Sequence, residues 1–273
     1  MPTPQQADAF HTEGYFIAED AVDPNMFDDL AAAARRAKAK VRAGQVDVYT
    51  HWSTPEKTEP WAIRGLLAPE FDDPVFAEYL MSKPILDYVH YFIGTELRLG
   101  AILIFTNPHH ADYDIGWHRD WGGIDDRDLD YDGEMAVLHK ARQGWRWHLA
   151  TVDDECLQIM PGSHRRYRTA HERTCLLQTR QSDIPGQRTI KLKAGQTAFW
   201  SGDTIHRGVY KKNAERLTIS AAWSVHEEGG EPQAVDERLR WRLREDVRAN
   251  LPEDMHPYYD RWHALQLHPD DAS

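Results

Sequence analysis

Apolar and polar residues repeat with different periods in the two halves of the chain. Near the N-terminus the period is helical: residues 24–41 carry one apolar stripe, and Asp23 stands before them as an N-cap, followed by proline. A second helix is predicted at residues 84–93, begun by Ser82 and ended by Gly94. Because each helix has a single apolar face, we expect both to lie against a sheet.

From residue 96 the pattern changes to short segments of β-forming residues separated by turn residues. Strands are predicted at residues 97–107, 115–121, 135–139, 145–152, 157–160, 189–192, 196–200, 207–210 and 216–225. Eight or so strands of this kind suit a double-stranded β-helix, the jelly roll. Beyond Gly229, helical spacing over residues 235–251 predicts a terminal helix, and the tail beyond Asp254 is predicted to be extended.

No repeat, low-complexity tract or long linker divides the sequence. The chain is therefore predicted to form a single domain, mainly β with flanking helices, over residues 1–273. Its parts are a helical buttress at about 1–95, a jelly roll at about 96–225, and a C-terminal helix and tail at about 231–273. A hydrophobic content of 41% is enough for an ample core.

Composition excludes several classes of function. A formal net charge of −12 argues against a nucleic-acid partner, because phosphate binding needs a basic surface. Cys156 and Cys175 are too few for a disulfide framework. No run approaches the ~18 apolar residues that span a bilayer, and the first residues lack the pattern of a signal peptide. We predict a cytoplasmic protein without a membrane partner, a monomer or a homodimer.

The triplet His118-Arg119-Asp120 carries the first candidate chemistry. Residues at i and i+2 of a strand point to one face, so His118 and Asp120 are predicted to bind one metal ion together, and His206 would complete the set from another strand. Two imidazoles and one carboxylate are ligands that suit non-haem iron(II) and leave three positions open, unlike a closed structural zinc site.

Arg216 begins an alternating run in which Arg216, Thr218 and Ser220 share a face. Taken alone, Arg216 would be a surface ion-pair residue and His206 a hydrogen-bonded loop histidine. Because these residue types occur in this order on strand-like segments, we predict instead a dicarboxylate site at Arg216 and Thr218, with the guanidinium as a bidentate fork.

Residues 155–165 read Glu-Cys-Leu-Gln-Ile-Met-Pro-Gly-Ser-His-Arg. They resemble the strand and Pro-Gly-Ser-His turn of the phytanoyl-CoA dioxygenase-like branch of the iron(II)/2-oxoglutarate oxygenases, and residues 10–17 are similar to the family's N-terminal helix-to-strand segment. The resemblance extends from about residue 9 to 225. Gly195-Gln196 stands where the family often has Gly-Asp, and Asn107-Pro108 where many members carry Lys-Pro.

The resemblance implies that His118, Asp120 and His206 bind Fe(II) and that Arg216 binds the distal carboxylate of 2-oxoglutarate, with O2 as the second cosubstrate. It implies an enzyme that oxidises, by default hydroxylates, an unactivated C–H of a small molecule in specialised or catabolic metabolism, while 2-oxoglutarate yields succinate and CO2. Asp120 argues against a halogenase, whose carboxylate position must be vacated.

Other outcomes stay open. Desaturation, epimerisation and ring formation depend on the substrate, which the sequence does not name. A non-oxidative metal hydrolase or isomerase on a jelly roll is a second class, although it has no use for a dicarboxylate clamp at Arg216. A catalytically silent binding module is a third, which the intact ligand set makes a poorer interpretation.

Two further segments are candidates for the substrate pocket. Trp145 and Trp147 alternate on a predicted strand, as pocket walls or equally as core residues, and the resemblance favours Trp145 for the cosubstrate site. Residues 125–134 form an acidic loop, either solvated or a rim that attracts a cationic substrate. Its acids are Asp125, Asp126, Asp128, Asp130, Asp132 and Glu134.

Overall fold

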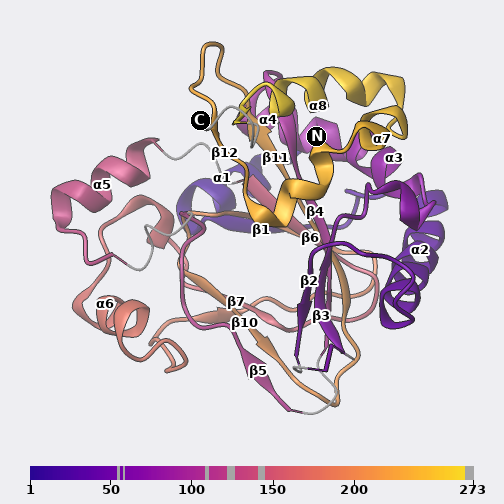
Figure 1. Cartoon of the computed structure of the whole chain (residues 1–273). Helices are drawn as coiled ribbons and strands as arrows, with labels where there is room; N and C mark the ends of the chain where they lie inside the picture. The colour runs from indigo at the N-terminus through magenta and orange to yellow at the C-terminus, as the bar shows by residue number, and fades with distance from the viewer. Residues whose placement is uncertain (54–55, 58, 108–110, 122–126, 141–144, 268–273) are drawn as a thin grey trace.

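The computed structural model describes residues 1–53, 56–57, 59–107, 111–121, 127–140 and 145–267 (Figure 1). Within these residues, seven strands form an antiparallel sheet in the order β1-β9-β6-β11-β4-β3-β2. Their bounds are β1 Tyr15–Ala18, β2 Thr50–Trp52, β3 Pro60–Arg64, β4 Leu97–Thr106, β6 Trp145–Ala150, β9 Thr197–Ser201 and β11 Leu217–Val225.

A smaller sheet has the order β5-β10-β7-β8 and faces the larger one. Its strands are β5 Tyr113–Asp114, β7 Leu157–Ile159, β8 Arg188–Thr189 and β10 His206–Tyr210. A short parallel pair joins β12 Gln233–Ala234 to β13 Gln266–Leu267. Two facing antiparallel sheets with flanking helices confirm the predicted mainly β jelly roll.

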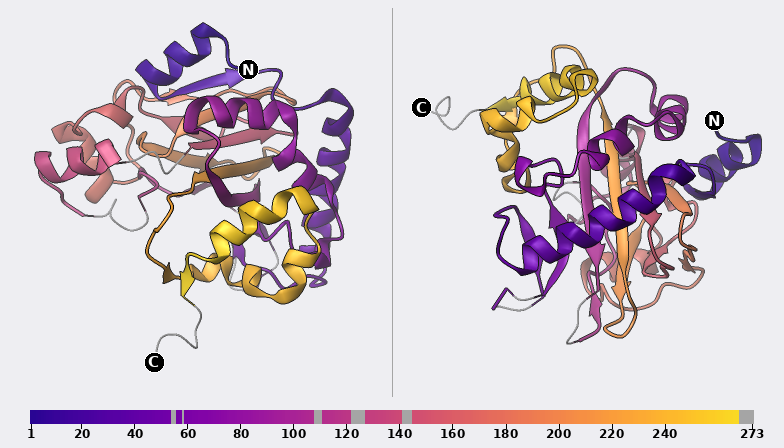
Figure 2. Two further views of the ribbon diagram at one scale, coloured as in Figure 1. Left: turned by 90° about the horizontal axis from the view of Figure 1, so that it is seen from above. Right: turned by 90° about the vertical axis from the view of Figure 1, so that its right-hand side faces the viewer.

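Helices pack on the larger sheet and beside the smaller one. They are α1 Pro4–Glu13, α2 Pro24–Arg42, α3 Val75–Met81, α4 Lys83–Ile93, α5 Tyr131–Lys140, α6 Ala170–Leu177, α7 Glu245–Ala249 and α8 His256–His263. Contacts of α2, α4 and α8 with the larger sheet place them on its side away from α5 and α6 (Figure 2). None of the described helices is both long and apolar enough to cross a membrane.

Strand alternation decides which side chains reach the space between the sheets. On β11, Leu217 and Ile219 are fully buried in the core under the helices, whereas Thr218 and Ser220 point to the opposite face. Side chains of the neighbouring strand β6 alternate in the same way between the face toward the helices and the face toward the smaller sheet. The larger sheet thus presents one apolar face to the helices and one face of mixed polar and apolar side chains to the smaller sheet.

Both helices predicted from the N-terminal pattern are confirmed. Asp23 caps α2 by accepting from the backbone N–H of Asn25, and α4 ends at Gly94, whose φ of 82° suits glycine. Residues 135–139, predicted as a strand, belong instead to α5. Asp130 accepts from the N–H of Gly133 at the start of this helix, and the i, i+4 pair Glu134 and Leu138 is buried.

Three other predictions are corrected. Residues 115–121 form no regular strand, because Gly116 has φ 78° and donates its N–H to the side chain of Asp114, which turns the backbone. The predicted terminal helix breaks at Arg244, whose backbone is extended, into a 3-10 helix Glu237–Leu243 and α7. The tail predicted to be extended contains α8, whose Tyr259 and Trp262 are buried.

Candidate metal and cosubstrate site

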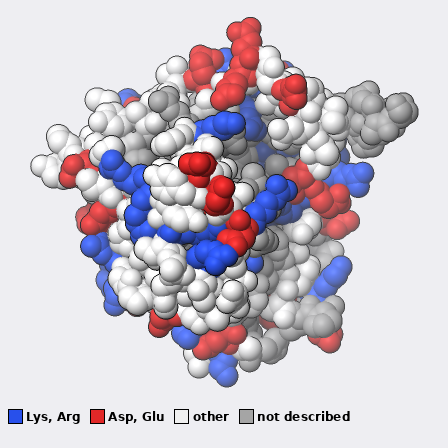
Figure 3. Space-filling view, turned by 90° about the vertical axis from the view of Figure 1, so that its left-hand side faces the viewer, with Lys and Arg blue, Asp and Glu red and all other residues white. Residues whose placement is uncertain are grey.

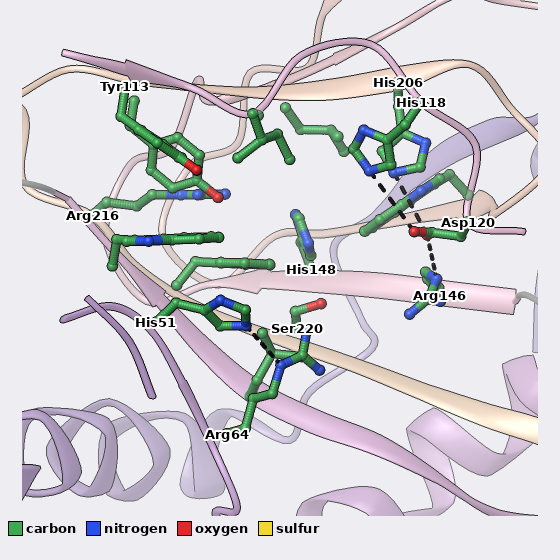
Figure 4. A pocket seen from close by; sticks show the side chains of 18 of the residues that line it. His51, Arg64, Tyr113, His118, Asp120, Arg146, His148, His206, Arg216 and Ser220 are labelled. Atoms are coloured by element: carbon green, nitrogen blue, oxygen red, sulfur yellow. Dashed lines mark hydrogen bonds and ion pairs between the residues drawn. The ribbon is translucent and has the colours of Figure 1, made fainter. Parts of the chain in front are cut away.

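The structure brings His118, Asp120 and His206 together. His118 lies opposite His206 in an antiparallel bridge, in which each backbone N–H donates to the other's carbonyl at 2.9 Å. The two imidazole rings lie 4.4 Å apart between centroids. Asp120 is fixed by its backbone N–H, which donates to the carbonyl of Gly202 at 2.8 Å. One candidate ligand atom from each of the three residues lies within 4.8 Å of the others (Figure 4).

Backbone carbonyls orient both imidazoles. Nδ1 of His118 lies 2.8 Å from the carbonyl of Gly116, and Nδ1 of His206 lies 2.8 Å from that of Thr204. Nδ1–H therefore donates outward, which leaves the Nε2 lone pairs on the side of Asp120. Burial, together with His118, lowers the pKa of His206 to about 4, so this imidazole is neutral at pH 7.

Asp120 is held as a carboxylate. Burial opposes its ionisation, but Arg146 and the neighbouring His206 outweigh this and lower the pKa to about 2. Nε of Arg146, on β6, lies 2.5 Å from Oδ2 of Asp120. Neutral imidazole nitrogens and an ionised carboxylate are a donor set that fits a divalent cation such as iron(II).

A cavity of about 540 Å³ lies between the sheets and has these residues at one end. Its size lies within the range of small-molecule sites. His148 stands in the middle of the cavity and Arg216 at the other end (Figure 4). Phe105 and Trp200 add apolar wall, and burial, followed by the charge of Arg216, keeps the pKa of His148 well below its usual value.

Arg216 is buried and only partly satisfied. Its Nε donates to Oδ2 of Asp154 at 2.8 Å, and its guanidinium carbon lies 4.9 Å and 4.4 Å from the ring centroids of Phe105 and Tyr210. Nη1 is buried with no hydrogen-bond partner among the described residues. A buried donor left unpaired costs about 1–3 kcal/mol, so a carboxylate of a bound ligand fits this position.

Asp154, on the loop after β6, was not anticipated from the sequence. Burial opposes its ionisation, but Arg216 outweighs burial and holds the pKa of Asp154 below its usual range. The backbone N–H of Cys156 donates to its other oxygen at 2.7 Å. Asn107, where the related family often has lysine, accepts from the backbone N–H of Arg216 at 3.2 Å. These contacts fix the direction of the guanidinium.

Thr218 corrects a prediction. Its side chain is fully buried and does not line the cavity. The hydroxyl donates to Oδ2 of Asp154, the same oxygen that Arg216 holds. Thr218 therefore orients the partner of Arg216 instead of offering a donor to a ligand, because the bend of the chain after β6 places Asp154 between them.

Of the two positions predicted for Trp145 and Trp147, pocket wall and core, the structure places both side chains in the core. Both lie in the core under the helices, where Trp145 stacks on Phe199 at 4.7 Å and Trp147 donates from Nε1 to the hydroxyl of Tyr79 at 3.0 Å. Neither lines the cavity. The physical reason is strand parity: the residues of opposite parity on β6, Arg146 among them, face the site.

The tryptophans that do line the cavity are Trp61 and Trp200. The sequence contains a signal for which face of β6 meets the cavity, because Arg146 and His148 alternate with the two tryptophans of this strand. When one face of a buried strand carries arginine and histidine, that face is expected to line a functional site, because buried charged and polar groups need partners. Trp61 lies on β3, a strand that the apolar pattern did not reveal.

The described part of the acidic loop, residues 127–134, does not line the cavity. Asp125 and Asp126 lie outside the described residues. No other acid of residues 127–134 lines the cavity, and Asp128 instead forms an ion pair with Arg173, while Glu134 is fully buried against Arg119. On the face that carries α5 and α6, acidic and basic side chains lie interleaved (Figure 3). Asp128, Asp130 and Glu134 are each engaged in local contacts there.

Comparison with known proteins agrees with this geometry. Residues 10–215 match the family model described as phytanoyl-CoA dioxygenase (PhyH). The curated proteins contain no match.

Solved structures share the fold. EctD from S. alaskensis with 2-oxoglutarate and 5-hydroxyectoine has 18% identity and a TM-score of 0.63, covering 82% of this chain and 77% of that chain. AviO1 from Streptomyces viridochromogenes Tue57 has 17% identity and a TM-score of 0.58, covering 85% and 99%. SnoN, a non-heme alpha ketoglutarate dependent epimerase from nogalamycin biosynthesis, has 17% identity and a TM-score of 0.56, covering 81% and 80%.

Proposed function

The chain belongs to the phytanoyl-CoA dioxygenase family of iron(II)- and 2-oxoglutarate-dependent oxygenases, and we propose that it hydroxylates an unactivated C–H bond of a small molecule. Within this proposal His118, Asp120 and His206 hold iron(II), and Arg216 binds the distal carboxylate of 2-oxoglutarate. When bound, iron(II) and 2-oxoglutarate would activate O2, of which one oxygen atom would enter succinate as 2-oxoglutarate loses CO2 and the other would enter the substrate.

One observation carries the proposal: the same cavity has the His-Asp-His set at one end and an unpaired, buried nitrogen of Arg216 at the other. A dicarboxylate that reaches the metal with one end needs a cationic donor for its far end. A hydrolase or isomerase would leave that buried donor unsatisfied, which disfavours the alternative of a non-oxidative metal enzyme.

The chain's own residues have separate tasks. The carbonyls of Gly116 and Thr204 keep the imidazole Nε2 atoms available, and Arg146 keeps Asp120 ionised and in place. Asp154 holds Arg216 in one orientation.

Oxygen-dependent release of succinate tests the proposal. The purified protein is supplied with iron(II), 2-oxoglutarate and a panel of acids, phosphate esters, amines, sugars and terpenoids, and products are analysed by mass. We expect succinate release that needs iron and oxygen, and a product that has gained one oxygen atom. Succinate release that is independent of iron would refute the proposal, as would a product formed equally well without oxygen.

A further inference from the structure

Basic side chains dominate the lining of the cavity. Asp120 is the acid among the described lining residues. The lining arginines are Arg64, Arg119, Arg146, Arg180, Arg216 and Arg238. Most of these charges have partners within the fold: Arg119 pairs with Glu134, Arg146 with Asp120, Arg216 with Asp154 and Arg238 with Asp236, while Arg180 donates to the carbonyl of Trp117.

Arg64 differs from the arginines in these ion pairs because it has no carboxylate partner among the described residues. It ends β3, is half-buried, and forms no ion pair with any carboxylate of the described residues. Its Nε donates to Nε2 of His51 at 3.1 Å, so His51 must be unprotonated on that nitrogen. Burial and then the charge of Arg64 lower the pKa of His51 to about 4, so His51 supplies no charge. Its orienting contact leaves the terminal nitrogens of Arg64 for a ligand.

The surroundings of Arg64 are unfavourable for its charge. Burial lowers its pKa to about 10, and the nearby charges of Arg238 and Arg146 add to this effect, while Asp236, the partner of Arg238, acts against it. At pH 7 the guanidinium is still protonated. Like charges gathered around one cavity destabilise the protein unless an anion occupies it.

Cosubstrate binding does not remove this excess of positive charge. Iron(II) and the 2-oxoglutarate dianion carry equal and opposite charges, so together they leave the balance of the cavity unchanged. Arg64 is also placed away from both anchor points: Figure 4 shows it below His148, with Arg216 to one side and Asp120 to the other.

Strand register explains the position. Arg64 pairs with Leu103 on β4, and Leu103 pairs with Ser220 on β11, which in turn pairs with His148 on β6. All four side chains line the cavity. This row crosses the floor of the cavity, with Arg64 at its β3 end and the Ser220 hydroxyl two strands away as a further donor.

We propose that the substrate of this oxygenase carries a carboxylate or phosphate group, which binds Arg64, with Arg238 and Ser220 as secondary donors, while the carbon to be oxidised lies toward His118 and His206. Only the placement of the reacting carbon near His118 and His206 rests on the proposed function, whereas the anion site at Arg64 does not. A guanidinium fork held by one neighbour is suited to an oxyanion, and the uncharged side chains of the row, Leu103, Ser220 and His148, can contact the rest of the molecule. The cationic substrate considered from the sequence is replaced by an anionic one.

Calorimetric titration with simple anions tests the proposal without knowledge of the substrate. Protein with iron(II) and saturating 2-oxoglutarate is titrated anaerobically with inorganic phosphate, acetate or acetamide, so that Arg216 is already occupied. We expect phosphate or acetate to bind and acetamide not to bind. Tighter binding of phosphate than of acetate assigns the site to phosphate esters, and the reverse order assigns it to carboxylates.

Three variants make the test specific. Arg64→Gln should weaken the anion about tenfold or more, as expected for loss of a charge-assisted hydrogen bond. Arg238→Gln should weaken anion binding less, because the pair of Arg238 with Asp236 is more exposed. This variant replaces Arg64→Gln in the test if Arg64→Gln does not fold. Arg240→Gln is the matched control, because Arg240 lies on the same 3-10 helix as Arg238, pairs with Glu237 and does not line the cavity.

Anion binding that is absent in the wild type, or that is equal in wild type, Arg64→Gln and Arg238→Gln, would overturn the proposal. The visible band of the iron–2-oxoglutarate complex is recorded on the same samples. If that band is absent while Arg64-dependent anion binding remains, the proposed oxygenase activity fails and the anion site stands. If the band is present without such binding, the anion site alone fails.

Discussion

Asp154→Asn tests how the cosubstrate arginine is held in place. Asn keeps the size of the side chain and an oxygen that can accept from the N–H of Cys156. It loses the negative charge that faces Arg216 and Thr218. Two charge-assisted hydrogen bonds of about 1.5–3 kcal/mol each are weakened, and an uncompensated guanidinium stays buried. Both considerations place the loss in unfolding free energy at about 3–5 kcal/mol.

Urea unfolding measures this loss, with the slope m compared between variants. The neighbouring Asp153→Asn is the control, because Asp153 pairs with Lys193 at 2.7 Å in an exposed ion pair, which contributes little to stability. The double variant with Arg216→Gln removes both buried charges, so its loss should fall short of the sum of the single losses by about 1–3 kcal/mol. Additive losses, or a loss under about 1 kcal/mol in Asp154→Asn, would refute the account of this pair.

The same pair gives a pH dependence with a definite sign. The pKa of Asp154 is lower in the folded than in the unfolded protein, so its contribution to stability is complete above the unfolded value of about 4. That contribution is lost as the pH falls below about 4. Stability of the wild type should therefore fall more steeply with acid than that of Asp154→Asn, and parallel curves would contradict the lowered pKa.

Further variants address individual residues. Asp120→Ala should abolish succinate release but leave the melting temperature nearly unchanged, since Asp120 lines the cavity and packs no core; wild-type turnover would refute its role. Arg216→Gln should weaken 2-oxoglutarate binding by about 1.5–3 kcal/mol, measured by titration, and an unchanged dissociation constant would place the dicarboxylate elsewhere. Trp147→Phe should cost about 1–3 kcal/mol of stability, because the hydroxyl of Tyr79 loses its partner, with 2-oxoglutarate affinity unchanged; altered affinity would reinstate Trp147 in the site.

The sequence predicted the parts of the fold that depend on local pattern. Alternation identified β4, β6 and β11, and caps identified α2 and α4. Helix α6 was not predicted, although the capping box of Thr169 and Glu172 is an equally local signal for its start. Residues 135–139 were misassigned because the alternation of a short apolar run does not reveal that Glu134 is buried by Arg119 and Arg168.

The candidate site was predictable where it follows from residue order and was missed where it depends on tertiary contacts. His118, Asp120, His206 and Arg216 meet at one cavity because strand register brings them there. Nothing local in the sequence links Arg216 to Asp154, which lies 62 residues earlier. The charge balance of the cavity is likewise a property of the assembled sheets, so it cannot be read from the acids of one loop.

The most direct test of the central claim is an anaerobic spectroscopic titration with iron(II), with and without 2-oxoglutarate. The account predicts a visible metal-to-ligand charge-transfer band that appears only when both are present. The band should be absent in Asp120→Ala and should require more 2-oxoglutarate in Arg216→Gln. A wild-type protein that gives no band at saturating iron(II) and 2-oxoglutarate would contradict the claim, as would a band that is unaltered in both variants.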